Sequence, residues 1–288
     1  ARGGRDAPSG AAPAPRQASG GAGVPGVRHI IAVASGKGGV GKSTTAANIA
    51  LAFRAQGLRV GLMDADVYGP SVPTLFGLHE KPEVEGKMMK PLEAHGLKIM
   101  SIGFLVEAGT AMIWRGPMVM SALTQMLTEV SWGELDVLVV DMPPGTGDAQ
   151  LTMAQRVKLS GAVIVSTPQD LALADARRGV AMFERVDVPI LGIVENMSYY
   201  CCPNCGHRAE VFGHGGARAE AALMKTPFLG EIPLAMEIRA TSDAGAPIVA
   251  QEPKSEHAKA YGRIAAQVWS RLTSGAPGRA APRIVIER

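Results

Sequence analysis

The sequence has few cysteines, no long apolar run and no marked excess of either charge. Only three of its 288 residues are cysteine, and all three lie between positions 201 and 205. A secreted disulfide framework would spread its cysteines along the chain, so this cluster favours metal or redox chemistry in a reducing compartment. No apolar run approaches the roughly 20 residues that a membrane-spanning helix needs.

The charges are nearly balanced, with 29 basic and 26 acidic residues and a net charge of +3. Nucleic acids and anionic membranes attract proteins through concentrated positive charge. We therefore expect no nucleic-acid partner and no stable membrane association. The N-terminus also lacks the charged head and apolar core of a secretory signal.

The composition divides the chain into three parts. Residues 1–26 are rich in Ala, Gly and Pro and have almost nothing to bury, which predicts a disordered linker. Residues 27–272 form the predicted folded domain, and residues 273–288 form a second Gly/Pro/Ala-rich segment, a C-terminal tail. Because the sequence opens with Ala, we expect a fragment whose linker followed an upstream domain. A processed organelle precursor is the competing interpretation.

Apolar β-type runs alternate with helical patterns through the predicted domain. Strands that are apolar throughout and alternate with helices predict an α/β fold with a mainly parallel sheet flanked by helices. The predicted strands are His29–Ala34, Arg59–Met63, Leu97–Ile102, Val137–Val140, Ala162–Val165 and Ile190–Val194. The predicted helices are Lys42–Arg54, Gly116–Val130, Leu171–Arg185, Ala217–Met224 and Ser255–Leu272.

A glycine-rich loop connects the first predicted strand to the first predicted helix. It reads Gly36-Lys37-Gly38-Gly39-Val40-Gly41-Lys42-Ser43-Thr44 and matches the phosphate-binding P-loop in the required structural context. Its backbone N–H groups and the helix N-terminus would surround phosphate oxygens. Lys42 would reach the terminal phosphates of ATP, and the Ser43 hydroxyl would bind Mg²⁺. The pattern predicts an ATP hydrolase.

The loop contains an additional lysine, Lys37, before the usual Lys42. In this it resembles the deviant P-loop ATPases, the superfamily of MinD and the nitrogenase iron protein. In that superfamily the additional lysine reaches the nucleotide of a partner subunit. The resemblance implies a homodimer closed around nucleotide. Lys37 and Lys42 are therefore both predicted catalytic residues.

Carboxylates follow two of the predicted strands. Asp141 ends an apolar strand in the Walker B pattern, where it would hold Mg²⁺ through a water. The superfamily resemblance implies that Asp66 positions the attacking water or the Mg²⁺ shell. Gly145 could approach a γ-phosphate closely, while Asp148 could either act there or cap the next helix. Because no strong general base is evident, we expect slow basal hydrolysis.

Asn196 follows the last predicted strand. An Asn amide can pair with adenine through two hydrogen bonds, and the superfamily uses an Asn at this strand end. The competing interpretation is an Asn that shapes a turn.

The cysteines lie in Cys201-Cys202-Pro203-Asn204-Cys205-Gly206-His207. Cys202 and Cys205 have the Cys-x-x-Cys spacing that lets two thiolates hold one metal centre. Iron–sulfur and structural zinc sites usually take four protein ligands, and a two-fold dimer would double this pair to four. Zinc within one chain, with His207, is the alternative. We assign no role to Cys201.

Together these motifs, including Asp64–Ser71, resemble the Mrp/ApbC/Nbp family of ATP-dependent iron–sulfur carriers over residues 27–272. The resemblance implies a [4Fe-4S] cluster held at a homodimer interface and passed to apo iron–sulfur client proteins, with a cluster assembly scaffold as supplier. The implied location is the bacterial cytoplasm, or alternatively the mitochondrial matrix. Trp114–Pro117 also fits the family pattern but has no assigned role.

The alternative function is a MinD/ParA-like positioning ATPase with a structural zinc at the cysteine loop. Such a switch would want a membrane-binding helix or a DNA-binding surface. The apolar stripe of the last predicted helix, residues 255–272, more often packs on a core than on lipid.

Overall fold

A computed structural model of the chain describes residues 23–105 and 116–274. Most of the predicted linker (1–26) and of the predicted tail (273–288) lies outside these residues, as do Trp114 and Arg115. Their predicted roles stay predictions. Within the described ranges, no helix combines the length and apolar character that crossing a bilayer requires.

One eight-stranded sheet organises the molecule, in the order β12-β9-β8-β1-β7-β2-β6-β5. Every neighbouring pair is parallel except β5 and β6, which are antiparallel. Its strands are β1 (Val27–Ala34), β2 (Val60–Asp64), β5 (Leu92–Ala94), β6 (Leu97–Ser101), β7 (Leu135–Asp141), β8 (Gly161–Ser166), β9 (Ile190–Glu195) and β12 (Phe228–Glu231). The predicted mainly parallel α/β fold is confirmed.

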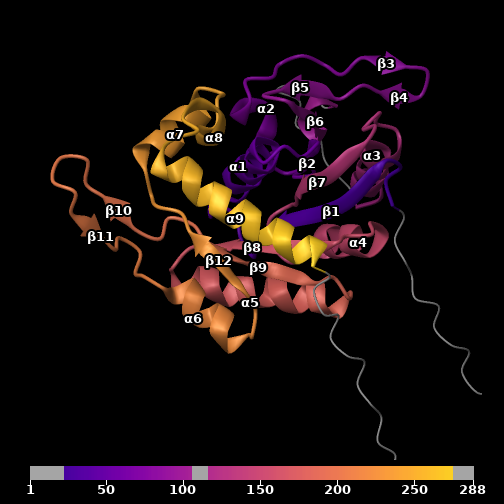
Figure 1. Cartoon of the computed structure of the whole chain (residues 1–288). Helices are drawn as coiled ribbons and strands as arrows, with labels where there is room; N and C mark the ends of the chain where they lie inside the picture. The colour runs from indigo at the N-terminus through magenta and orange to yellow at the C-terminus, as the bar shows by residue number, and fades with distance from the viewer. Residues whose placement is uncertain (1–22, 106–115, 275–288) are drawn as a thin grey trace, which may run out of the picture.

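Helices cover both faces of the sheet (Figure 1). One face carries α1 (Lys42–Ala55), α7 (Met236–Asp243), α8 (Ile248–Gln251) and α9 (Glu256–Thr273), with α2 (Val72–Leu75) at its side. The other carries α3 (Gly116–Thr128), α4 (Asp148–Arg156), α5 (Asp170–Arg185) and α6 (Gly216–Leu223). A short 3-10 turn, η1 (Ile102–Phe104), follows β6.

Burial on both faces explains why the strands are apolar throughout. Every residue of β2 and of β8 is buried, and the largest enclosed side chains include Trp132, Phe53 and Phe183. Helix α9 packs its stripe of Ala258, Ile264, Ala265 and Val268 into this core, as its spacing predicted.

Two small hairpins stand apart from the main sheet. Strands β3 (Val84–Glu85) and β4 (Met88–Met89) form one, and β10 (Tyr200–Cys201) and β11 (Arg208–Ala209) form the other. The second projects from the body of the molecule and holds the cysteine turn at its tip (Figure 1). This hairpin follows β9 in the chain, so it starts at the carboxyl end of the parallel strands.

Candidate nucleotide and metal site

The P-loop connects β1 to α1 at the carboxyl end of the central strands. Gly39 and Gly41 have φ angles of 80° and 76°, which glycine adopts without strain, and Gly41 is the N-cap of α1. The loop borders a cavity of about 260 Å³. Its lining is Ser35, Lys37, Gly38, Gly39, Gly41, Lys42, Ser43, Thr44, Asp66, Ser71 and Pro144. The predicted phosphate cradle and Asp66 therefore share one cavity.

Lys42 occupies the centre of this site, where it is 6% exposed. Its Nζ lies 2.5 Å from Oδ1 of Asp141 and 3.5 Å from Oδ2 of Asp66, and it donates to Ser43 Oγ at 3.3 Å. Three elements thus bring the predicted lysine, serine and two carboxylates together. A phosphate would draw Lys42 from the carboxylates and free them for a cation.

Asp141 is fully enclosed at the end of β7, and its Oδ2 has no hydrogen-bond partner in the described chain. Burial raises the pKa of this carboxyl, although Lys42 opposes the shift. An unpartnered buried oxygen beside Ser43 suits a bound Mg²⁺ with its waters. The residues present therefore fit the cation that a nucleotide brings.

Asp64, which the sequence analysis did not assign, organises the loop after β2. Its Oδ1 accepts the Asp66 N–H at 3.1 Å, while Oδ2 accepts from Val72 N–H at 3.1 Å and Ser101 Oγ at 2.9 Å. Burial, with the nearby charge of Asp141, raises the pKa of Asp64 to about 7. Its place beside Asp66 in the sequence was the available signal.

The loop after β7 contacts the P-loop directly. Gly145 has a φ of 94°, and its N–H donates to Ser35 O at 3.0 Å. No atom lies within 4 Å of the position where a Cβ would be, so a phosphate oxygen could approach. Asp148 is the first residue of α4, but its side chain lies outside the described residues.

Asn196 is buried behind the P-loop. Its Nδ2 donates to Val40 O at 2.8 Å, a contact across 156 positions of sequence. The amide thus supports the phosphate loop. Its predicted pairing with adenine stays a prediction.

Lys37 lines the nucleotide cavity at half-buried exposure. Across residues 23–105 and 116–274, its ammonium group makes no hydrogen bond or ion pair. A free cation at the rim of an anion site is what reaching into a second subunit requires, although the reach itself stays a prediction.

The cysteine turn is closed by the backbone. Cys202 N–H donates to His207 O at 2.9 Å, and Gly206 N–H donates to Cys202 O at 2.8 Å. The N–H groups of Cys205 and Asn204 and the Cys205 thiol hydrogen-bond to the Cys202 sulfur and lower the pKa of Cys202. A sulfur held by donors is poised as a thiolate ligand. Cys202 is half-buried, while Cys201 and Cys205 are exposed.

Within the described part of the chain, no third metal-binding side chain converges with Cys202 and Cys205. Among the described residues, three metal-binding side chains converge only at Glu195, His214 and Glu231. Glu195 already accepts from Ser198 and from the Ala217 N–H at the start of α6, and Glu231 pairs with two arginines. The predicted zinc alternative with His207 therefore has no preformed site here.

A phosphate cradle between a strand and a helix, faced by acids from two neighbouring strands, defines a P-loop NTPase. The comparisons agree. A family model described as "ParA: NUBPL iron-transfer P-loop NTPase" matches residues 26–269. The chain belongs to this family of iron-transfer P-loop NTPases.

Curated relatives from bacteria and from mitochondria are similar over most of their length. The Arabidopsis thaliana "Iron-sulfur protein required for NADH dehydrogenase, mitochondrial" is 58% identical over 84% of this chain and 78% of its own. The mouse "Iron-sulfur cluster transfer protein NUBPL" is 54% identical, covering 87% and 80%. The Escherichia coli K12 "Iron-sulfur cluster carrier protein" is 53% identical, covering 87% and 68%.

Solved structures share the fold. A nucleotide-binding protein from Archaeoglobus fulgidus in complex with ADP has a TM-score of 0.69 and 43% identity, covering 80% of this chain and 90% of its own. Pyrococcus furiosus MinD has a TM-score of 0.63 at 22% identity, covering 84% and 98%. The second likeness shows the MinD-type fold alone.

Proposed function

We propose that two copies of this chain hold a [4Fe-4S] cluster between them and pass it to apo iron–sulfur proteins, with Mg-ATP controlling the assembly. Cys202 and Cys205 of each copy are the four ligands. Lys37, Lys42, Asp66 and Asp141 act on the nucleotide. A cluster assembly scaffold supplies the cluster, in the bacterial cytoplasm or the mitochondrial matrix.

The cysteine turn is the observation that carries this proposal. It offers two thiols at an exposed tip, with the Cys202 sulfur held by N–H donors. One chain supplies this pair and no converging third ligand in the described ranges. Two copies related by a two-fold axis supply the usual four. An exposed site also lets the cluster leave.

The nucleotide site supports control by ATP. Lys42 lies between Asp141 and Asp66, and Lys37 lines the same cavity. Bound ATP would take Lys42 onto its phosphates, and Mg²⁺ would occupy the carboxylate side with Ser43. Mg²⁺ neutralises phosphate charge in the transition state. Lys37 of the partner copy would add a second positive charge there.

A short covalent path connects the two sites. Asn196 touches the P-loop at Val40 O, and only six positions separate it from Cys202. Two backbone hydrogen bonds hold the segment between Asn196 and Cys202 in place. Ser198 N–H donates to Ile232 O at 3.0 Å, and Leu234 N–H donates to Tyr199 O at 2.7 Å. A P-loop displaced by nucleotide would therefore shift the base of the hairpin.

Anaerobic reconstitution with iron and sulfide tests the proposal. We expect about four iron and four sulfide per dimer in the native chain, and loss of both in Cys202→Ser and Cys205→Ser. Cys201→Ser is the matched control and should keep its cluster. Metal analysis, iron–sulfur absorption and sedimentation give the stoichiometry.

One result would contradict the proposal directly: one zinc per monomer, retained in the presence of iron and sulfide. That outcome would favour the alternative, a positioning ATPase with a structural zinc. If the Lys42→Ala variant forms the cluster and transfers it to an apo-acceptor as fast as the native chain, then transfer does not depend on ATP.

A further inference from the structure

Strand β12 is an edge strand of the sheet. Its inner side pairs with β9, and no strand of the described chain pairs with its outer side. The backbone groups of such an edge are a template for another extended segment. Helix α9 reaches the strand through Gln267, whose Nε2 donates to Leu229 O at 2.8 Å.

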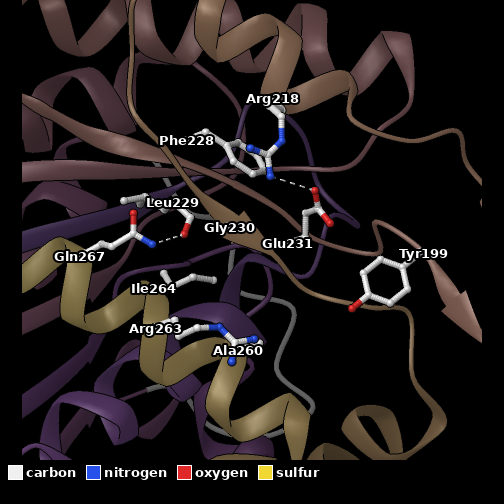
Figure 2. A pocket seen from close by; sticks show the side chains of 10 residues that line it. All are labelled: Tyr199, Arg218, Phe228, Leu229, Gly230, Glu231, Ala260, Arg263, Ile264 and Gln267. Atoms are coloured by element: carbon white, nitrogen blue, oxygen red, sulfur yellow. Dashed lines mark hydrogen bonds and ion pairs between the residues drawn. The ribbon is translucent and has the colours of Figure 1, made fainter.

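An open cavity of about 370 Å³ follows this edge. Figure 2 shows β12 running between Arg218, on the side of α6, and Arg263 and Ile264 from α9. Successive side chains of a strand point to opposite faces of a sheet. Side chains of an added strand would therefore meet Arg218 and Phe228 on one face and Ile264 and Arg263 on the other.

The cavity continues toward the cysteine turn. A second cavity of about 440 Å³ is lined by Cys201 and Cys202 and by residues of α7 and α9. Both cavities share Tyr199, Ala260 and Arg263 in their walls. A segment lying along β12 would thus reach the cavity that Cys201 and Cys202 line.

Two arginines, Arg218 and Arg263, and one acid, Glu231, line the first cavity, whereas Glu237 and Glu256 line the second. Arg208 and Arg218 lie 3.6 and 3.3 Å from the carboxylate of Glu231 and share that one acid. Arg263 is exposed, lines both cavities and makes no ion pair or hydrogen bond with any described residue. It interacts electrostatically with Glu256 without forming an ion pair, so the planar guanidinium can still bind a carboxylate in the first cavity.

We propose that the β12 groove, formed by Tyr199, Arg218, Phe228, Glu231, Arg263 and Ile264, docks an extended acidic segment of a partner protein. The segment adds to the sheet as a strand beside β12 and brings a carboxylate to Arg263. The partner's identity rests on the proposed function: it is a protein that supplies or receives the cluster at Cys202.

Fluorescence anisotropy with the full chain tests the groove. The probe is fluorescein-labelled Val-Thr-Val-Glu-Val-Glu, and Val-Thr-Val-Gln-Val-Gln is its matched control. We expect the Glu peptide to bind about tenfold more tightly, because a hydrogen bond to a charged group contributes more binding free energy than one between neutral groups. Arg263→Gln should remove this difference. Arg239→Gln, an exposed arginine on α7 outside the groove, should preserve it.

Backbone pairing is tested with two further peptides, N-methylated at alternate residues on one strand edge or on the other. An added strand turns one edge toward β12, so only one of the two peptides should lose binding. Equal binding by both would overturn strand addition, and an unchanged affinity in Arg263→Gln would overturn the groove.

The chain's own apolar residues Ile284–Ile286 are a rival occupant, and they lie outside the described structure. If the probe binds only to the full chain carrying Val285→Asp, this segment fills the groove and the proposal is overturned. Equal binding by the native chain and Val285→Asp supports an external partner.

A transfer assay connects the groove to the proposed function. An apo-ferredoxin bearing the Glu hexapeptide at its C-terminus should receive cluster several-fold faster than one bearing the Gln hexapeptide, and Arg263→Gln should equalise the two. Equal rates from the native chain would sink the docking role alone. Absence of any cluster, with peptide binding intact, would instead count against the proposed function.

Discussion

At the scale of single residues, the charged side chains do two different kinds of work. Lys42 and Asp141 are enclosed and paired at the site, with a contact that spans 99 positions of sequence. Asp136 lies outside the site, at the opposite end of the sheet. It accepts from the Arg59 guanidinium at 3.0 and 3.2 Å and from the Arg59 N–H at 2.9 Å, with Arg28 at 3.4 Å.

Asp136 should contribute a pH-dependent part of the stability. Its hydrogen bonds to Arg59 lower the pKa of Asp136 to about 2. A carboxyl with a lowered folded-state pKa stabilises above its unfolded pKa, and this contribution is lost as the pH falls through the folded value. We expect Asp136→Asn to lower the free energy of unfolding by about 1 kcal/mol at pH 7.

Urea unfolding at several pH values measures this effect. The difference between Asp136→Asn and the native chain should shrink as the pH falls from about 4 toward 2. Glu83→Gln removes an exposed pair with Lys90 and should change the free energy by less than about 0.5 kcal/mol. A pH-independent difference at Asp136 would show that packing, not charge, is responsible.

The residue types of the site were predictable, but their contacts were not. Lys42, Ser43 and Asp141 were assigned from motif patterns and Asp66 from the superfamily resemblance, and the structure brings them together. Asp64 was not assigned, because the resemblance implies one functional carboxylate in this loop and Asp66 was chosen. Only its bonds to Val72 and Ser101 show that it fixes the loop.

At the scale of elements, the P-loop depends on a close approach by α5. A Cβ at Gly36 would overlap the backbone carbonyl of Asp175, whereas a Cβ at Gly38 would meet nothing within 4 Å. The two glycines look alike in sequence. Their steric requirements differ because a helix from the other half of the sheet touches one of them.

We therefore expect Gly36→Ala to lower the free energy of unfolding by about 1–3 kcal/mol, since a backbone atom cannot move aside as a flexible side chain can. Gly38→Ala should stay within about 0.5 kcal/mol of the native chain. Thermal and urea unfolding measure both, and ADP titration reports on the loop. Equal stability of the two variants would contradict this account of the loop.

The sequence predicted most of the sheet and five helices, but missed other elements, among them β12 and α7. All six predicted strands and all five predicted helices exist, with shifted ends. Strand β12 was missed because its apolar run stops after two residues, at Gly230. Neighbouring β9, not its own sequence, makes it a strand.

At the scale of the whole molecule, the P-loop, the acids and the cysteine hairpin all lie at the carboxyl end of the parallel strands. The P-loop follows β1, Asp66 follows β2, Asp141 ends β7 and the cysteine hairpin follows β9. Parallel strands end on the same side, so nucleotide and cysteines face a common direction. A second copy meeting this end of the sheet would contact both sites together.

Substitution of Lys37 tests whether two copies meet at the nucleotide site. We expect Lys37→Gln to keep nucleotide affinity within about threefold, because Lys42 and the loop amides remain. It should lose dimerisation that depends on ATP, since the partner's phosphates lose their opposing charge. Sedimentation velocity with and without ATP measures this. Lys158→Gln, an exposed change between α4 and β8, is the control. ATP-dependent dimers of unchanged strength in Lys37→Gln would refute the reach across subunits.

By itself, the sequence determined the phosphate loop, the acids at the strand ends and the paired cysteines, because spacing along a short stretch encodes each of them. The tertiary structure decided which of these meet. Strand β1 lies between β7 and β8, so residues far apart in the chain become neighbours at one edge. For the same reason Asn196 supports Val40, and Arg263 lies beside the free edge of β12.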